Sequence, residues 1–341
     1  MKLNPSILPR NTPDCQIAPW HHELASAFTD PALLLAELGL EPREVPGLDA
    51  AAAGFGMRVP RGYAALMERG NPQDPLLRQV LPLLAEQQVV AGYGTDPVGD
   101  GAADLGHGLL QKYAGRALLL ACGACAVHCR YCFRRHFEHH ASDGETDRHD
   151  AAIARIAADD SLSEIILSGG DPLMLDDARL GSLVERLAAI GHLRRLRIHS
   201  RLPVVLPSRV SERLCDLLGA QRLTPVMVIH ANHPHELGVD SERALQRLAR
   251  AGVTLLNQSV LLRGVNDDAD TLASLSSRLL ACGVLPYYLH QLDRVQGAAH
   301  FEVEDNRAKR LLATLRERCP GYLVPRLVRE RPGATAKMSM E

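Results

Sequence analysis

The chain has 341 residues, 46% of them hydrophobic, which is enough to bury a large core as one big domain, alone or with a small second one. A formal net charge of -2 provides no basic surplus for direct binding to nucleic acid. The sequence has no signal-peptide core at its start and no apolar run approaching the roughly 20 residues that span a bilayer, so we expect a cytoplasmic protein with no membrane partner.

Residues 1–108 lack strand alternation and are broken by Pro and Gly, which predicts a helical cap. The helical patterns lie at residues 23–38, 60–68 and 74–87. The third pattern opens with Asp74 and Pro75, a favourable N-cap followed by Pro at the first helical position.

From residue 117 onward, short apolar strands alternate with helical segments at intervals of about 30 residues, as in βαβ units. The predicted strands are residues 117–121, 164–168, 196–199, 225–230, 254–260 and 285–291. The predicted helices are residues 151–158, 178–189, 211–218, 242–251, 270–281 and 306–318. Such units form a partial barrel or an open doubly wound sheet, and both place their chemistry at the carboxyl ends of the strands.

Three thiols follow the first predicted strand, where residues 125–132 read CAVHCRYC. Cys125, Cys129 and Cys132 stand at i, i+4 and i+7, which suits a [4Fe–4S] cluster with one iron left open for a ligand. Including Cys122 gives a four-cysteine run, but paired zinc knuckles normally need a longer spacer. We interpret Cys122 as a packed residue at the strand end, with a fourth cluster ligand as the alternative. The other four of the eight cysteines are scattered, so no disulfide framework is expected.

Further polar residues follow the later strands. Gly169, Gly170 and Asp171 come directly after the second strand, where adjacent glycines let a ligand approach the backbone and amides beside a carboxylate suit an amino-acid-like ligand. The alternative is an ordinary tight turn. Asp293 follows the sixth strand. Lys337 follows a Gly-containing turn near the C-terminus, where a lysine is usually part of a solvated tail.

The thiol motif followed by an aromatic residue resembles the radical S-adenosylmethionine enzymes. Because the residues directly after it read FRR, the closer likeness is to the lysine 2,3-aminomutase family, and within it to the branch that prepares β-lysine for modification of elongation factor P. The likeness covers roughly residues 60–337 and selects a partial (β/α)₆ TIM-like barrel. It implies a cap at residues 1–108, a radical core at 109–322 and a C-terminal cofactor-lysine segment at 323–341.

The resemblance also implies three cofactors, which are a [4Fe–4S] cluster, S-adenosylmethionine and pyridoxal phosphate. The cluster ligands are then Cys125, Cys129 and Cys132. The residues implied at S-adenosylmethionine are Gly169, Gly170, Asp171, His230 and Gln258. Those implied at pyridoxal phosphate are Lys337, as the Schiff-base lysine, with Tyr113 and Arg116. Those implied at the substrate are Arg134 for the carboxylate, with Asp293 and Glu330 for a terminal ammonium.

Two features depart from the family pattern. The family commonly has Arg where this chain has Lys112, so a bidentate phosphate contact at this position is not expected. The aminomutases proper continue beyond the cofactor lysine with a cysteine-bearing tail that binds zinc, whereas this sequence ends at Glu341, so we expect no structural zinc.

The implied activity is that of an isomerase that converts L-α-lysine to β-lysine, in the R form. A deoxyadenosyl radical would remove hydrogen from carbon 3, and an imine with pyridoxal phosphate would let the nitrogen migrate. The product would serve the β-lysylation of elongation factor P by its lysyl ligase. Two alternatives stay open: a radical enzyme that works without pyridoxal phosphate, and a non-catalytic iron–sulfur protein that assembles on elongation factor P. A homo-oligomer also stays open.

Overall fold

The computed structural model of the protein describes residues 18–51, 54–137 and 145–341. Its strands are β1 (Leu109–Tyr113), β2 (Arg116–Cys122), β3 (Glu164–Gly169), β4 (Arg195–Ser200), β5 (Thr224–Ile229), β6 (Thr254–Leu261), β7 (Leu285–Gln291), β8 (Arg326–Arg329) and β9 (Met338–Ser339). Its longer helices are α5 (Glu145–Ala157), α6 (Asp177–Ala188), α8 (Glu212–Gly219), α9 (Val239–Arg250), α10 (Ala269–Ala281) and α11 (Asp305–Arg318).

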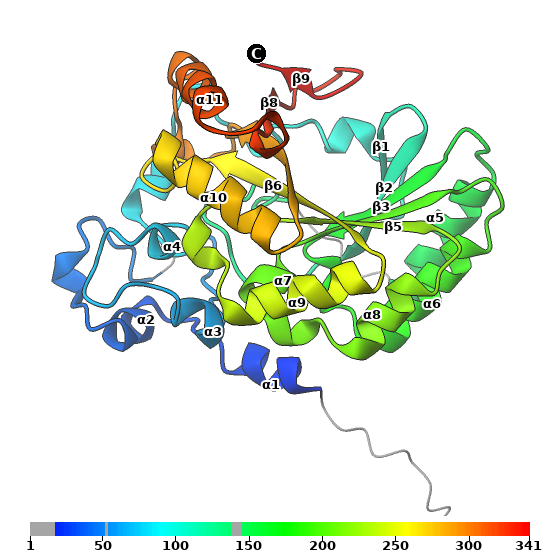
Figure 1. Cartoon of the computed structure of the whole chain (residues 1–341), viewed down its shortest axis with the longest axis horizontal. Helices are drawn as coiled ribbons and strands as arrows, with labels where there is room; N and C mark the ends of the chain where they lie inside the picture. Colours follow the sequence, from blue (N-terminus) through cyan, green and yellow to red (C-terminus); the bar gives the residue numbers. More distant parts are fainter. Residues whose placement is uncertain (1–17, 52–53, 138–144) are drawn as a thin grey trace, which may run out of the picture.

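The described strands form a single nine-stranded sheet whose spatial order is the chain order, from β1 to β9. Strands β2 to β8 pair in parallel, whereas β1 and β9 pair antiparallel at the two edges. Each of β2 to β7 is followed by one of the longer helices, which gives the six predicted β/α units (Figure 1). Because β1 and β9 stand at opposite ends of the order, the architecture is the predicted partial barrel.

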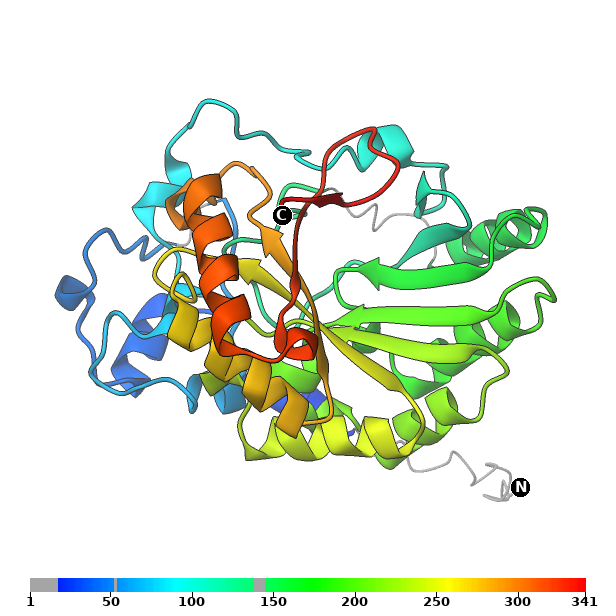
Figure 2. The same cartoon turned by 45° about the horizontal axis from the view of Figure 1, so that its top comes forward.

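The six predicted strands are confirmed as β2 to β7, but the sequence did not predict β1, β8 or β9. Strand β1 contains Gln and Lys, β8 has four residues with Arg at both ends, and β9 has two residues. These short segments carry too little apolar alternation to be recognised alone, since their pairing partners define them. The C-terminal segment with β8 and β9, drawn in red, lies beside the space that the strands surround (Figure 2).

The helices cover the outer face of the sheet because each carries an apolar stripe. In α6 the buried side chains are Leu180, Leu183, Val184 and Leu187, which is the i, i+3, i+4, i+7 spacing of one helical face. They belong to the same hydrophobic cluster as Ile165 and Leu167 of β3. Burying each such side chain contributes roughly 1.5–3 kcal/mol, so this stripe fixes α6 against the sheet.

The N-terminal cap is helical as predicted, but its helices are shorter than expected. They are α1 (Pro19–Ala25), α2 (Pro31–Glu37), α3 (Arg61–Ala64) and α4 (Pro75–Arg78), with 3₁₀ turns η1 (Pro42–Glu44), η2 (Leu84–Gln87) and η3 (Gly101–Ala103). Asp30 caps α2 and Pro31 begins it, which divides the helix predicted over residues 23–38. The N-cap at Asp74 is confirmed, since its carboxylate accepts from the amides of Leu76 and Leu77 at 2.8 and 2.9 Å.

The helix predicted over residues 74–87 was wrong in extent. Helix α4 ends at Arg78, and the turn η2 begins only after Pro82. Proline lacks the amide that would continue a helix through this point.

The remaining short elements are α7 (Leu202–Val205), η4 (Pro172–Met174), η5 (Pro207–Arg209), η6 (Pro234–Glu236), η7 (Ala299–Phe301) and η8 (Gly321–Leu323). Cap and barrel share one hydrophobic cluster, in which Leu34 and Leu76 join the strands. No helix in the described ranges has the length and apolar character needed to cross a membrane.

The carboxyl end of β3 lies against the loop that follows β2. The amide of Gly170 donates to the carbonyl of Cys122 at 2.7 Å, and the amide of Asp171 donates to that of Ala124 at 2.8 Å. A Cβ atom on Gly169 would lie 2.4 Å from the Cys122 oxygen, and one on Gly170 would lie 2.2 Å from the Ala124 oxygen. The adjacent glycines are therefore needed for the approach of the chain's own thiol loop, which is a different reason from the ligand approach that the sequence suggested.

We expect Gly170→Ala to destabilise the protein by about 1–3 kcal/mol, because the added methyl group overpacks a backbone contact that cannot relax through side-chain motion. Gly191→Ala is the matched control, since no atom lies within 4 Å of its added Cβ, and its effect should stay within about 0.5 kcal/mol. Denaturant unfolding of both variants and the parent measures the difference. Equal stability of the two variants would contradict this account of the Gly-Gly pair.

Candidate active site

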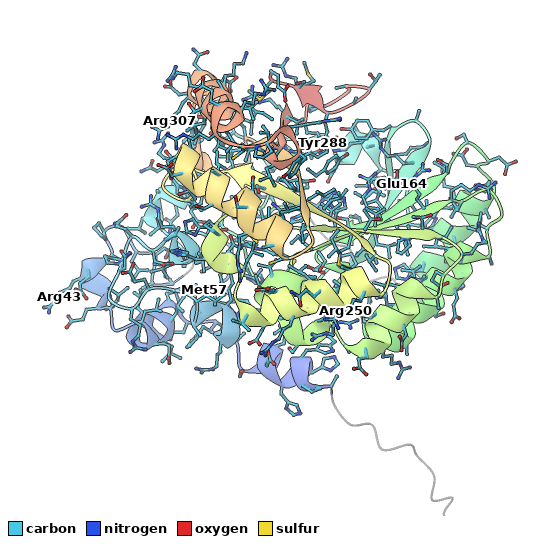
Figure 3. The ribbon with its side chains drawn as sticks, viewed as in Figure 1. Arg43, Met57, Glu164, Arg250, Tyr288 and Arg307 are labelled. Atoms are coloured by element: carbon cyan, nitrogen blue, oxygen red, sulfur yellow. The ribbon has the colours of Figure 1, made fainter. Side chains whose placement is uncertain are left out.

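All the site residues predicted from the sequence line one cavity of about 480 Å³. It lies on the face of the sheet opposite the helices, where Ile166 lines the cavity and its neighbours Ile165 and Leu167 face the core. Tyr288 of β7 lies near the C-terminal segment (Figure 3). The predicted residues that the cavity brings together are Tyr113, Arg116, Cys125, Cys129, Cys132, Arg134, Gly169, Gly170, Asp171, His230, Gln258, Asp293, Glu330 and Lys337.

The cap holds the thiol loop through a buried carboxylate. Glu86, in η2, accepts from Nε and Nη2 of Arg130 at 2.8 and 2.6 Å and from Nη2 of Arg135 at 2.6 Å. Arg130 lies between the second and third thiols, and its side chain is 1% exposed. Its Nη1 also donates to the carbonyls of Phe55 and Gly56. The loop therefore takes its position from the cap as well as from the strand before it.

The three thiols have the donor chemistry that an iron–sulfur cluster requires, since such clusters are held by cysteine thiolates. Among the described residues, no three His, Cys, Asp or Glu side chains are arranged around a single metal ion. A cluster is larger than one ion and offers a separate iron to each thiolate, so its ligands are spread more widely. Burial raises the pKa of Cys132 to about 11, with Cys129 adding to the effect, so binding iron must displace protons here.

Asp171 connects the ends of β3 and β4. Its buried carboxylate accepts from the amides of Leu173 and Arg201 at 3.0 and 2.7 Å and from the hydroxyl of Ser200 at 2.8 Å. Burial raises the pKa of Asp171 to about 6, although these donors oppose the shift. Contact between Asp171 and S-adenosylmethionine stays a prediction, while in this structure the carboxylate binds donors of the chain itself.

A row of alternating charges crosses the cavity. Lys337 Nζ donates to Glu330 at 2.7 Å, and Lys112 Nζ contacts the other Glu330 oxygen at 3.0 Å. Lys112 also pairs with Asp100 at 2.6 Å, and Asp100 accepts from Nε of Arg134 at 2.7 Å. The sequence analysis missed Asp100, because it lies in a Gly-rich turn without periodic pattern. The two ends of this row are the predicted cofactor lysine and the predicted carboxylate-binding arginine.

The two carboxylates predicted at the substrate differ in their surroundings. Burial raises the pKa of Glu330, but Lys337 and Lys112 outweigh it and lower that pKa to about 2. Burial and the charges of Glu330 and Asp100 raise the pKa of Asp293 to about 7, against the opposing effect of the two lysines. The Asp293 carboxylate has no ion pair or hydrogen bond with a side chain in the described part of the chain. Asp293 is thus available to a ligand, whereas Glu330 already holds two ammonium groups.

Three histidines line the cavity near the carboxyl ends of β4, β5 and β7. They are His199, His230 and His290, and the Nε2 atom of each has no hydrogen-bond partner among the described residues. Burial lowers the pKa of all three, and that of His230 falls to about 4, so they are neutral at pH 7. The sequence analysis predicted only His230. The signal for the other two was their position next to the last residue of a strand.

Basic and aromatic groups line the part of the cavity next to β1 and β2. The Arg116 guanidinium lies 4.7 Å from the centre of the Tyr113 ring. Lys112 donates to the carbonyl of Val98 at 2.9 Å and pairs with Asp100 and Glu330. Arg197 and Arg326 also line the cavity, and the sequence analysis missed both because they lie within strands.

The chain is similar to known proteins along nearly its whole length. The Radical SAM superfamily matches residues 120–275. L-lysine 2,3-aminomutase of Escherichia coli (strain K12) is 47% identical over 337 residues, which cover 98% of this chain and 97% of that protein. The protein of the same name from Haemophilus influenzae is 46% identical over 97% of this chain and 98% of its own. The one from Clostridium subterminale is 34% identical, over 93% of this chain and 76% of its own.

The matched stretch, residues 120–275, contains the three thiols and the glycine pair after β3. The chain is therefore an isomerase that belongs to the L-lysine 2,3-aminomutase family of radical S-adenosylmethionine enzymes.

Proposed function

We propose that this protein converts L-α-lysine to β-lysine, using a [4Fe–4S] cluster, S-adenosylmethionine and pyridoxal phosphate. The observation that carries the proposal is that the three thiols, Lys337 and Asp293 line one cavity. A radical source, an amine that can bond a carbonyl cofactor and a free carboxylate are what the reaction needs within reach of one substrate. The printed names of the relatives support lysine as that substrate.

The residues present fit pyridoxal phosphate. Lys337 extends into the cavity beside the Tyr288 ring, with its Nζ 5.9 Å from the ring centre, and Glu330 holds its ammonium at 2.7 Å. Arg116 and Tyr113 bind the phosphate side, since a guanidinium suits a phosphate geometrically. When bound, the cofactor supplies a carbonyl group that bonds an amino nitrogen.

The residues present also fit the cluster and S-adenosylmethionine. Cys125, Cys129 and Cys132 hold the cluster, which supplies single electrons when bound. His230 and Gln258, at neighbouring strands on the same cavity, bind the nucleoside. As a neutral imidazole, His230 can donate or accept a hydrogen bond there.

The substrate is held at both ends. Arg134 donates from Nε to Asp100 and from Nη1 to the hydroxyl of Ser168, the latter at 3.0 Å. We assign its Nη2 to the substrate carboxylate. Asp293 binds the terminal ammonium. We assign Glu330 the positioning of Lys337, because both of its oxygens already hold ammonium groups; the direct contact predicted for Glu330 stays a prediction.

We further propose that the product is the R isomer and that a lysyl ligase attaches it to elongation factor P. The support for this part is the likeness of the thiol motif and the FRR that follows it to that branch of the family.

The test is anaerobic reconstitution of the full chain, followed by incubation with L-lysine, S-adenosylmethionine and pyridoxal phosphate. Chiral chromatography should show (R)-β-lysine. Cleavage of S-adenosylmethionine without β-lysine and without bound pyridoxal phosphate would favour a radical enzyme of another kind. A bound cluster with no cleavage at all would favour a non-catalytic iron–sulfur protein.

We expect Lys337→Ala to lose the borohydride-reducible bond to pyridoxal phosphate while keeping its fold and iron. The stability loss should stay below about 3 kcal/mol, because Glu330 keeps its contact with Lys112. Lys112→Ala is the matched control, since it removes the other ammonium from Glu330 and leaves Lys337 in place. Peptide mapping after borohydride treatment should find the phosphopyridoxyl group on Lys337 in the parent and in Lys112→Ala. Finding it elsewhere in Lys337→Ala would refute the assignment.

We expect kcat/KM for L-lysine to rise as pH increases through about 7, because Asp293 must lose its proton to attract an ammonium. The raised pKa of Asp293 means that its neutral form predominates below this pH. Asp293→Asn should lack the rise and should lose about 2–5 kcal/mol of transition-state stabilisation at pH 8, as a desolvated charge pair is removed.

Norleucine, which lacks the terminal amine, is the matched substrate control for Asp293. It should be a poor substrate of the parent enzyme with no rise of this kind, and Asp293→Asn should discriminate against it much less. An identical pH profile of the parent enzyme and Asp293→Asn with lysine would show that another residue binds the ammonium.

A further inference from the structure

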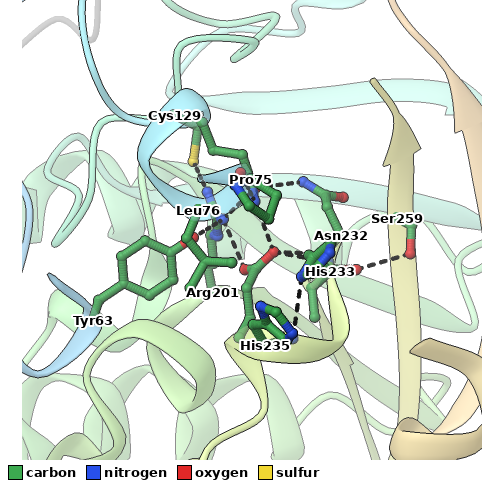
Figure 4. Close-up of polar contacts among 12 residues, drawn as sticks. Tyr63, Pro75, Leu76, Cys129, Arg201, Asn232, His233, His235 and Ser259 are labelled. Carbon is green, nitrogen blue, oxygen red and sulfur yellow. Dashed lines mark hydrogen bonds and ion pairs between the residues drawn. The ribbon is translucent and has the colours of Figure 1, made fainter. Parts of the chain in front are cut away.

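A buried polar network meets the thiol loop at Cys129 (Figure 4). Its centre is Arg201, which directly follows β4 and is 6% exposed. Nη1 of Arg201 donates to Sγ of Cys129 at 2.7 Å. Nη2 donates to Glu236 at 2.9 Å and to Gln79 at 2.8 Å. Arg201 is therefore a permanently charged donor on the sulfur of a predicted cluster ligand.

Glu236 fixes this guanidinium in place. Its side chain is fully buried, and one oxygen pairs with Arg201 while the other accepts from the amides of Asn232 and His233 and from the Gln79 amide group. A fully bonded carboxylate cannot turn away, and Arg201 cannot leave without stranding a buried charge. The contact with sulfur is therefore held by a rigid ion pair.

The cap contributes the remaining contacts of Arg201. Tyr63, in α3, accepts from Nη2 at 3.2 Å, and Gln79 is the C-cap of α4. The rings of Tyr63 and Tyr131 flank the guanidinium, with their centres 5.6 and 5.7 Å from its central carbon. Residues from the cap, the thiol loop and the ends of two strands thus position one donor.

Cys129 differs in this respect from the other two thiols. Within the described residues it is the one member of the triad whose sulfur accepts from a charged side chain. Arg58 approaches the loop near Cys125, but it donates to the backbone carbonyl and not to the sulfur. Of the three thiols, Cys129 is therefore the one whose sulfur lies beside a positive charge.

We propose that Arg201 raises the reduction potential of the cluster through its hydrogen bond and charge at Cys129, and that Glu236 limits the effect. Reduction adds one negative charge to the cluster, and a cationic donor on a ligand sulfur stabilises that charge. The interaction is strong because the network is buried, where water screens little. Arg201 is in this sense a positioning residue that acts through Cys129, and the inference rests on the cluster of the proposed function.

The test is an anaerobic redox titration of the full reconstituted chain, followed by electron paramagnetic resonance of the reduced cluster. At the potential where the parent is half reduced, Arg201→Gln should lower the ratio of reduced to oxidised cluster at least tenfold, which is 59 mV for one electron. Glu236→Gln should shift the midpoint in the opposite direction, because it leaves the arginine charge uncompensated. Tyr63→Phe is the matched control and should keep the parent midpoint, since it removes an acceptor of Nη2 and leaves the sulfur contact.

If an unpaired buried charge prevents either single variant from folding, the double variant that combines Arg201→Gln with Glu236→Gln can be titrated instead. It has no unpaired buried charge and lacks the sulfur donor, so its midpoint should still lie below that of the parent. Midpoints of Arg201→Gln, or of the double variant, that equal the parent value with full iron content would overturn the inference. Absence of iron and sulfide from the reconstituted parent would instead refute the cluster itself, so the two failures are distinguishable.

Discussion

The buried carboxylate of Glu86 is the contact on which the geometry of this protein depends. It binds two arginines of the thiol loop, Arg130 and Arg135, and it belongs to the cap rather than to the barrel. Because two guanidinium groups share one carboxylate, a shift of the loop would leave a buried arginine without its anion, which is costly. On its other side the loop meets the Gly169–Gly170 pair, which leaves no room for a side chain. The thiols are thus clamped between cap and sheet.

The sequence predicted the parts of this arrangement that local patterns encode. Apolar runs of strand length predicted β2 to β7. The thiol spacing, the glycine pair and the Gly-containing turn before Lys337 predicted residues that all line one cavity. The partners of those residues were not predictable in this way. Asp100, Glu86 and Arg201 act on residues far away in the chain, and nothing in their own neighbourhoods indicates this. Strands β1, β8 and β9 were not predicted for a similar reason, since their pairing partners define them.

Three of the cations that line the cavity share two carboxylates. Lys337, Lys112 and Arg134 share Glu330 and Asp100, whereas the Asp293 carboxylate has no side-chain partner among the described residues. The three histidines of the cavity add polar atoms without charge, because desolvation lowers their pKa. A zwitterion that enters such a site meets the Asp293 carboxylate and Nη2 of Arg134. The cavity is therefore suited to long amino acids with a cationic end.

The hairpin of β8 and β9 determines which residues face each other at the cofactor lysine. Its register pairs Val328 with Ser339 and Arg329 with Met338, so the next pair outward is Glu330 with Lys337. The 2.7 Å ion pair is thus an extension of the strand register. Residues 331–336 connect these two ends, and Ala336 also lines the cavity. A slip of one residue would turn the lysine toward the opposite face, and the enzyme would keep its fold while losing its reactive amine.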